Sequence, residues 1–280
     1  MRTLNRRTFL RAGLSTFAAA TAVGTYTWRI EPEWLEVVHR PLPIRGLPPR
    51  LARKTLVQFS DIHVGPRVDD DYLIETFKRI GQLRPDIVVI TGDLTSYSDT
   101  VFRQVESVYR YFPNGRLGTL AIPGNHDYGV NWSHPEVAQR VADAVRPFGI
   151  EMLRNEMREV EGLQVAGLDD LWAGRFDVGP LARLDQHRGA LVLTHNPDTV
   201  DLPGWDAYEG WILAGHTHGG QCKPPFLPPP LLPVRNTRYT CGEFELSGHR
   251  RLYVSRGVGH LLRVRFNVRP EVTIFELRVA

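Results

Sequence analysis

Short apolar runs alternate with amphipathic stretches from about residue 54 to the C-terminus. Runs of four or five apolar residues predict buried strands, whereas apolar positions three or four residues apart predict helices. We predict strands at 56–60, 87–91, 120–123, 190–194, 211–214, 251–255 and 271–278, and a strand pair over 158–166. We predict helices at 70–83, 101–112 and 135–148. This alternation indicates an α/β fold, with a two-layered β sandwich flanked by α-helices.

The helix predictions depend on periodicity and on proline positions. Leu73, Phe77 and Ile80 fall on one face of the first helix, and Pro85 follows its end. The third helix opens at Pro135, because proline is well tolerated at the first helical position. The stretch 224–233 is too rich in proline to form a regular strand or a helix interior.

The N-terminus has the pattern of a targeting segment. Arg6-Arg7, then Phe9-Leu10 and a weakly apolar stretch from 12 to 23, resembles a twin-arginine export signal. A cleavage site is available at Ala20-Thr21-Ala22. The alternative is an uncleaved helix that anchors the protein to a membrane. We therefore expect either a periplasmic or other extracytoplasmic enzyme, exported by the twin-arginine machinery, or a membrane-anchored one.

These patterns divide the chain into three parts. Residues 1–28 form the signal or anchor, and 29–50 form a linker that can contribute one edge strand. Residues 51–280 form the catalytic domain, which is long enough to bury a sizeable core.

Composition and charge narrow the class of protein. The chain has 280 residues, of which 42% are hydrophobic and 23% are charged, as in globular proteins. Its net charge of +3 suits anionic substrates or contact with a membrane surface, but no basic cluster predicts a nucleic-acid partner. Two cysteines, Cys222 and Cys241, do not make a disulfide framework, and whether they pair stays open.

Metal-capable side chains follow five of the predicted strands. The carboxyl ends of strands form the ligand crevice in α/β sheets, so side chains far apart in the sequence can converge there. Each of these residues alone could instead be a helix cap, a turn residue or a core histidine. Their joint occurrence in order at strand ends indicates a metal site. The residues are Asp61 and His63, Asp93, Asn125-His126-Asp127, His195, and His216 and His218.

This ordered set resembles the calcineurin-like metallophosphoesterase superfamily over roughly residues 54–280. The resemblance implies two divalent ions and a hydrolase that acts on phosphoesters. By position, Asp93 bridges both ions. The first ion is held by Asp61, His63 and His218, and the second by Asn125, His195 and His216. Cys222 follows the histidine-rich turn, but the implied ligand set is complete without it.

The resemblance also implies the chemistry at this site. Carboxylate, amide and imidazole ligands without thiolate suit Mn, Fe, Zn or Co. His126 stands beside the substrate, where it protonates the leaving oxygen or stabilises the transition state. We expect Asp127 to orient His126 by accepting its other ring proton.

The C-terminal part resembles a phosphodiesterase branch that includes lipid-precursor pyrophosphatases, which act on UDP-2,3-diacylglucosamine. The resemblance rests on Ser255-Arg256-Gly257-Val258-Gly259 and the arginines after it, although His260 stands where the branch more often has a small residue or threonine. Arg256, Arg263 and Arg265 are candidates for binding a second phosphate, with a solvated basic face as the alternative. The stretch 224–233 either forms an apolar rim that touches a lipid or packs as a cap on the domain.

Three functions remain open from the sequence. The first is a dinuclear-metal phosphodiesterase that hydrolyses phosphodiester or pyrophosphate bonds of a phosphoester substrate, including a lipid-linked one. The second is a phosphomonoesterase or protein phosphatase of the same fold. The third, from another class, is a metal-dependent protein that binds without turnover.

Overall fold

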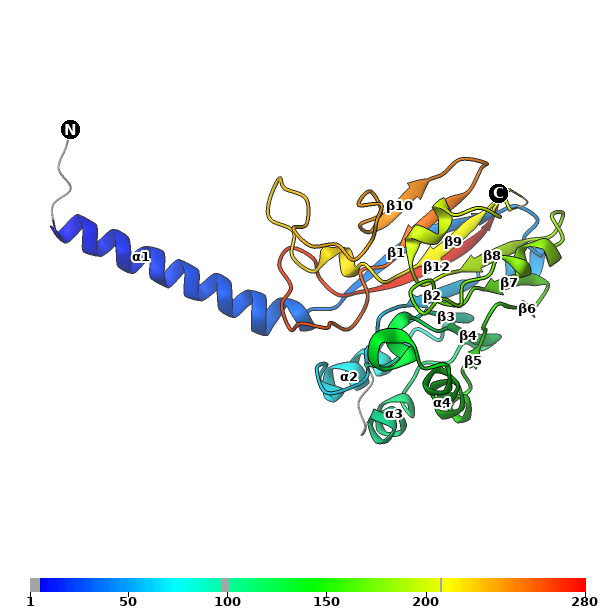
Figure 1. The fold of residues 1–280 in the computed structure, drawn as a ribbon, viewed down its shortest axis with the longest axis horizontal. Coiled ribbons are helices and arrows are strands. Elements are labelled where there is room, and N and C mark those ends of the chain that lie inside the picture. The colour runs from blue at the N-terminus through cyan, green and yellow to red at the C-terminus, as the bar shows by residue number, and fades with distance from the viewer. Residues whose placement is uncertain (1–5, 97–100, 207) are drawn as a thin grey trace.

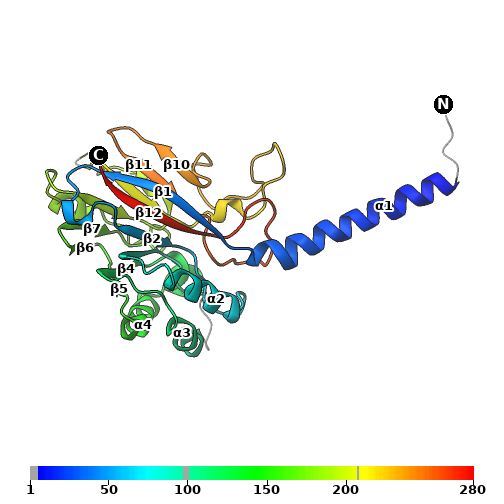
Figure 2. The same cartoon turned by 180° about the vertical axis from the view of Figure 1, so that it is seen from behind.

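The computed structural model describes residues 6–96, 101–206 and 208–280. Within these ranges the chain folds into two six-stranded sheets that pack face to face (Figures 1 and 2). The first has the order β1 (Glu36–Ile44), β12 (Glu271–Val279), β2 (Thr55–Phe59), β3 (Ile87–Thr91), β4 (Gly118–Ile122) and β5 (Glu151–Met152). The second has the order β10 (Gly242–Glu245), β11 (Arg251–Val254), β9 (Trp211–Ala214), β8 (Ala190–Leu193), β7 (Leu163–Gly167) and β6 (Glu156–Val160).

Apolar side chains from both sheets fill the space between them. Leu56 and Val89 of the first sheet belong to the same buried cluster as Val165 and Leu213 of the second. Removing this apolar surface from water is the main force that holds the two layers together. The predicted two-layered β sandwich is therefore confirmed.

Three α-helices cover the outer face of the first sheet (Figure 1). They are α2 (Asp70–Gly81), α3 (Val101–Tyr109) and α4 (Pro135–Val145), all close to their predicted ranges. The side chain of Asp69 caps α2 by accepting a hydrogen bond from the backbone N–H of Tyr72, 3.1 Å away. The predicted apolar face of α2 is buried, because Leu73, Phe77 and Ile80 join the cluster beneath the helices.

The outer face of the second sheet has a different cover. Here the 3-10 helices η7 (Gly179–Arg183) and η8 (Pro197–Asp201) contribute Leu181 and Val200 to a third apolar cluster, which also holds the side chain of Trp205. The α-helices of the described catalytic domain thus flank one side of the sandwich.

Residues 36–44, which we placed in a linker, form strand β1. It pairs in parallel with β12 over nine residue pairs, from Glu36 with Glu271 to Ile44 with Val279. Pro41 and Pro43 lie within it, and proline is tolerated because β1 is an edge strand. The edge strand that the sequence allowed within 29–50 is therefore present, and the first sheet begins before residue 51. The short strands β5 and β10 were absent from the prediction.

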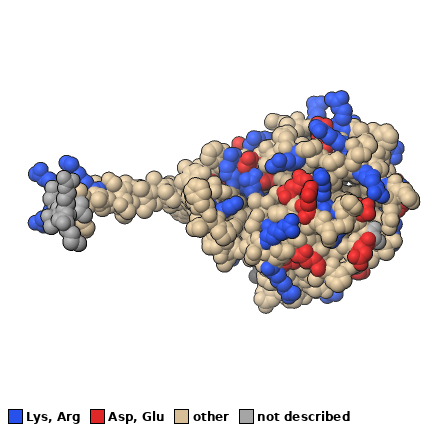
Figure 3. Space-filling view, turned by 90° about the horizontal axis from the view of Figure 1, so that it is seen from above, with Lys and Arg blue, Asp and Glu red and all other residues tan. Residues whose placement is uncertain are grey.

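The N-terminal helix α1 (Arg6–Thr25) projects away from the sandwich (Figure 1), and none of its side chains is buried. The described part of its outer end carries arginines, whereas the rest of the helix carries uncharged residues (Figure 3). Two short helices, η1 (Tyr26–Ile30) and η2 (Glu31–Glu33), join α1 to the body. Among the described residues, no helix has the length and apolarity needed to cross a bilayer.

Candidate metal centre

The metal-capable side chains lie where the carboxyl ends of strands from both sheets meet. Strands β2, β3 and β4 are parallel neighbours, so the segments that follow them leave the first sheet at one edge. Strands β8 and β9 are parallel neighbours in the second sheet. Backbone hydrogen bonds tie these segments together, with Asp61 N–H donating to the Gly92 carbonyl and Gly215 N–H to the His195 carbonyl, both at 3.0 Å.

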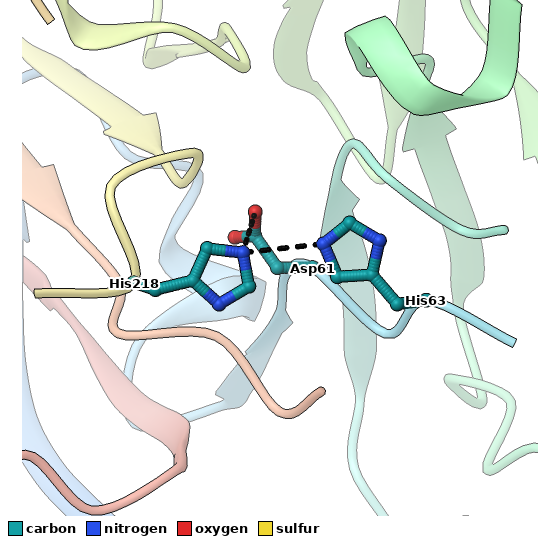
Figure 4. A group of neighbouring side chains, drawn as sticks. All are labelled: Asp61, His63 and His218. Atoms are coloured by element: carbon teal, nitrogen blue, oxygen red, sulfur yellow. Dashed lines mark hydrogen bonds and ion pairs between the residues drawn. The ribbon is translucent and has the colours of Figure 1, made fainter. Parts of the chain in front are cut away.

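Asp61, His63 and His218 form the first group (Figure 4). One ligand atom of each lies within 4.8 Å of the others, and all three residues are buried. The Nε2 atom of His218 lies 3.3 Å from Oδ1 of Asp61 and 3.2 Å from Nε2 of His63. Both imidazole rings therefore turn the same type of nitrogen toward one point beside the carboxylate.

Asp93, His195 and His216 form the second group, which also has all its ligand atoms within 4.8 Å. The Nε2 atom of His195 lies 3.2 Å from Oδ2 of Asp93 and 3.1 Å from Nδ1 of His216. The side-chain oxygen of Asn125 lies 3.2 Å from the same His195 nitrogen. The structure thus brings the amide into the second group, as the sequence predicted.

One oxygen of Asp93 faces both groups. Its Oδ2 atom lies 3.5 Å from Nε2 of His63 and 3.2 Å from Nε2 of His195. All seven residues predicted as ligands consequently share one buried site, with Asp93 between the two halves.

The backbone at this site adopts conformations that side chains normally avoid. Five of the seven predicted ligands have a φ angle in the left-handed region: Asp61 (51°), His63 (54°), Asp93 (52°), His216 (72°) and His218 (48°). Such residues each cost about 1–3 kcal/mol and cluster where function fixes the geometry. Neighbouring glycines allow close approach, because a Cβ atom on Gly92 would lie 2.3 Å from Nδ1 of His195.

Hydrogen bonds on the far side of each ring set which nitrogen faces the site. Nδ1 of His195 lies 2.8 Å from the Thr91 carbonyl, and Nε2 of His216 lies 2.8 Å from the Pro233 carbonyl. A carbonyl can only accept, so a proton sits on that nitrogen, and the other nitrogen points inward, where its lone pair becomes available when the ring carries a single proton. His63 makes the corresponding contact through Nδ1 with Oγ of Ser96, at 3.0 Å.

The electrostatics favour positive charge between the groups. Burial would raise the pKa of Asp61, but the histidine charges of His218 and His195 outweigh it and lower this pKa. Burial opposes ionisation of Asp93 too, yet His195 and His126 hold its pKa well below the usual range. Burial would lower the pKa of His195, but Asp93 and Asp61 raise it to about 10. Burial and His195 lower the pKa of His216 to about 3.

The donor set fits two divalent cations. The inward-facing nitrogens of His63 and His218 lie 3.2 Å apart beside ionised carboxylates. A cation bound between the two nitrogens would accept both lone pairs. Imidazole, carboxylate and amide donors suit borderline divalent metals. The two groups are thus consistent with a pair of divalent ions.

His126 lies at the edge of this site. Its ring centroid is 5.1 Å from that of His63, and its backbone N–H donates to Oδ1 of Asp93 at 2.8 Å. Burial lowers the pKa of His126. The ring is therefore close to the ligand groups without belonging to either.

Asp127 does not contact the His126 ring among the described hydrogen bonds. Its carboxylate accepts backbone N–H groups of Gly124 (2.9 Å), Leu94 (3.1 Å) and Thr95 (2.9 Å). These donors come from two segments of the site. The predicted hydrogen bond with His126 is wrong, and Asp127 instead ties the turn after β4 to the segment after β3.

The three arginines predicted to bind substrate are engaged inside the protein. Arg265 is fully buried and donates to the carbonyls of Gly259 (2.8 Å), Arg256 (2.9 Å) and Val268 (3.1 Å). Arg256 pairs with Glu271 and, at 3.0 Å, with Glu36.

Arg263 pairs with Glu33 at 2.5 Å. These contacts engage each guanidinium inside the protein, although the buried Nε atoms of Arg263 and Arg265 have no hydrogen-bond partner among the described residues. The fully buried Arg265 thus has a structural role, whereas substrate binding by Arg256 and Arg263 stays a prediction. Glutamates pair with Arg256 and Arg263, whereas backbone carbonyls surround Arg265, and the sequence order reveals neither kind of partner.

Some residues near the site were not identified from the sequence. Ser96 and the Pro233 carbonyl hold the rings of His63 and His216. Trp172 lies beside the His216 ring, and Trp132 beside Trp172. A backbone carbonyl has no sequence signal at all. Cys222 and Cys241 are free thiols, and the two ligand groups contain neither.

Comparisons with known proteins agree with this geometry. Residues 54–220 match the calcineurin-like phosphoesterase family. The chain is 31% identical to the uncharacterized metallophosphoesterase YkuE of Bacillus subtilis, over 99% of both chains. It is also 31% identical to the phosphodiesterase YaeI of Escherichia coli, over 98% of this chain and 99% of that one.

The name of a more distant relative includes its substrate. The UDP-2,3-diacylglucosamine pyrophosphatase LpxG of Chlamydia trachomatis is 25% identical, over 95% of this chain and 96% of that one. Both the match over 54–220 and the full-length relatives agree with the strand-end motifs. The chain therefore belongs to the calcineurin-like phosphoesterase family and is a metal-dependent phosphoric ester hydrolase.

Proposed function

We propose that this protein is a dinuclear-metal phosphodiesterase that hydrolyses phosphodiester or pyrophosphate bonds. The observation that carries the proposal is the position of Asp93, whose Oδ2 lies 3.5 Å from His63 Nε2 and 3.2 Å from His195 Nε2. A carboxylate between two ligand groups suits a pair of ions that share it. The phosphodiesterase YaeI and the pyrophosphatase LpxG, as relatives, favour a diester or pyrophosphate over a monoester.

In this proposal the chain positions the substrate and moves one proton. Two divalent ions, when bound, neutralise the anionic phosphoryl group and acidify the attacking water. Asp61, His63 and His218 would hold one ion, and Asn125, His195 and His216 the other, with Asp93 between them.

His126 supplies the proton in this scheme. From the edge of the site its imidazolium donates to the leaving oxygen as the ester bond breaks. Burial lowers its pKa, which makes the ring a stronger acid when protonated. The hydrogen bond from the backbone N–H of His126 to Asp93 holds this residue beside the ligand groups.

Turnover of bis(p-nitrophenyl) phosphate against p-nitrophenyl phosphate tests the proposal. The protein should be assayed after reconstitution with Mn²⁺, Fe²⁺, Zn²⁺ or Co²⁺, the ions that the donor set suits. We expect a higher kcat/KM for the diester with at least one ion. Preference for the monoester would instead support the alternative phosphatase, and inactivity with every ion would support a binding protein.

A lipid-linked substrate is the finer part of the proposal. Side chains of Phe226, Leu227 and Leu231 in the proline-rich loop are exposed, Phe226 completely. Leu262, on a separate segment, is exposed as well. Exposed apolar groups of this kind mark contacts with lipids or partners. Together with the substrate of the relative LpxG, they favour a substrate with acyl chains, such as UDP-2,3-diacylglucosamine.

Export or anchoring by the N-terminal segment is also proposed. The helix α1 carries Arg6, Arg7 and Arg11 at its outer end and leaves Phe9, Phe17 and other apolar side chains exposed. Twin-arginine export predicts a cleaved, extracytoplasmic form, whereas an uncleaved helix predicts membrane association. Replacing Arg6 and Arg7 by Lys, followed by cell fractionation, separates the two, because only the first depends on the arginine pair.

A further inference from the structure

Two tryptophans from different segments form a tilted aromatic pair beside the ligand groups. The ring centroids of Trp132 and Trp172 are 4.8 Å apart with an interplanar angle of 32°. The Trp172 centroid lies 4.4 Å from that of His216, and the Trp132 centroid lies 6.1 Å from that of His126. The pair thus touches a predicted metal ligand on one side and the predicted proton donor on the other.

The conformation of one of these segments is strained. Trp132 and the preceding Asn131 have φ angles of 57° and 54°, in the left-handed region, and Gly129 has a φ of 73°. A bulky residue such as tryptophan is a genuine outlier there. Strain of this kind persists at sites where the surrounding structure fixes a side chain for function.

A buried polar cluster locks the two segments to each other. The Tyr128 hydroxyl donates to Oδ1 of Asp169 at 2.5 Å, which joins the turn that leads to Trp132 with the loop that leads to Trp172. Arg154 bonds both partners, at 3.0 Å to the Tyr128 oxygen and 3.2 Å to Oδ2 of Asp169. The mutual position of the two indole rings is therefore determined by more than their own contact.

The pair forms one wall of a hollow of about 580 Å³. Asp198 accepts the backbone N–H groups of Arg235 (2.7 Å) and Asn236 (3.0 Å), which fixes the opposite wall. The Arg235 side chain is exposed and has no ion pair among the described residues. The hollow consequently combines the indole ring of Trp172, a residue that is 37% exposed, with the guanidinium group of Arg235.

We propose that this hollow is the recognition site for a planar, unsaturated ring on one arm of the substrate, of the nucleobase class. Indole faces bind such rings by stacking, and the contact tolerates different bases because each has a π face. Arg235 would pair with a further phosphate on the same arm. The proposal rests on the proposed function for the reaction, but ring binding itself requires no turnover.

The test compares two ligands that differ only in the ring. Isothermal titration calorimetry of the full-length, metal-reconstituted protein measures the Kd of uridine 5′-monophosphate and of ribose 5-phosphate. Both carry the same phosphate monoester, so contributions from metal ions are shared. We expect uridine 5′-monophosphate to bind about tenfold more tightly, as for one stacked base.

Variants assign the difference to the tryptophan. Trp172→Ala should abolish the discrimination between the two ligands, and Trp172→Phe, which keeps a planar ring, should retain part of it. Trp34→Ala is the matched control, since Trp34 is also exposed but lies over Arg269, away from the ligand groups. Circular dichroism of each variant verifies the fold.

Several outcomes would overturn the proposal. They are equal affinity for the two ligands in the wild type, no measurable binding of either, or discrimination that survives Trp172→Ala. For Arg235, we expect Arg235→Gln to weaken binding of uridine 5′-diphosphate about tenfold more than binding of the monophosphate. Discrimination between the ring-bearing and ring-free ligands without any diester hydrolysis would keep this site and refute the phosphodiesterase.

Discussion

The backbone carbonyl of Pro233 lies 2.8 Å from Nε2 of His216, so the proline-rich loop touches the second ligand group directly. The same loop exposes Phe226 and Leu231 to solvent. A hydrogen bond to the outer nitrogen of a metal-binding histidine fixes its tautomer and its orientation. The segment that suits lipid contact thus also fixes a ring that suits metal binding.

Substituting both Phe226 and Leu231 with Ser should selectively impair a lipid-linked substrate. The side chains are exposed, so their loss removes little buried apolar area and the fold should persist. We expect kcat/KM for a diacylated phosphodiester in vesicles to fall at least about tenfold, because about 0.8 kcal/mol is lost for each CH₂ group no longer buried in lipid. That for bis(p-nitrophenyl) phosphate should stay within twofold.

Leu83→Ser is the control for this prediction, because Leu83 is exposed just beyond the end of α2. It should leave both rates unchanged. An equal loss on both substrates in the double variant would show that the loop acts only through the structure of the site.

Asp93→Asn should remove bound metal and activity together. The amide keeps the shape of the side chain but loses the charge that two groups share. We expect metal content, measured by plasma mass spectrometry, to fall from two ions to one or none. Activity should fall at least about 100-fold, the upper range for groups that only orient a ligand.

The exposed Asp71→Asn in the first turn of α2 provides the matched carboxylate control. Two ions retained in Asp93→Asn, with full activity, would refute the bridging position of Asp93.

His126→Ala should lower kcat by about 100-fold or more without loss of metal, because a positioned general acid contributes about 10²–10⁴-fold. The size of the effect should depend on the leaving group. In a series of aryl methyl phosphates, a phenol of high pKa needs a proton more than p-nitrophenol does. A plot of log kcat against the leaving-group pKa should therefore become steeper in the variant. An unchanged slope would exclude proton donation by His126.

Arg265→Met should destabilise the fold rather than weaken substrate binding. The substitution removes the buried donor to the Gly259, Arg256 and Val268 carbonyls. Each buried acceptor left unsatisfied costs about 1–3 kcal/mol, so we expect the free energy of unfolding in urea to fall by about 3 kcal/mol.

The exposed Arg278→Met is the control for Arg265, and its effect should remain within about 0.5 kcal/mol. A raised KM with unchanged stability in Arg265→Met would instead restore the predicted role in binding substrate.

Local sequence patterns predicted most of the fold. Continuous apolar runs such as 87–91 and 211–214 are strands because both faces of each are buried, and α2 follows its apolar spacing. For the edge strand β1 the sequence predicted only that a linker could contribute one strand, because its prolines and exposed residues remove the apolar signal that buried strands give.

The sequence alone determined which side chains can bind metal and which strand ends carry them, since residue type and order are local properties. Only the tertiary structure decided their partners. It placed one oxygen of Asp93 between two histidines, turned Asp127 toward backbone amides and enclosed Arg265 among carbonyls. Side-chain partners depend on how two sheets pack across long stretches of chain, and the periodicity of one segment contains no information about that packing.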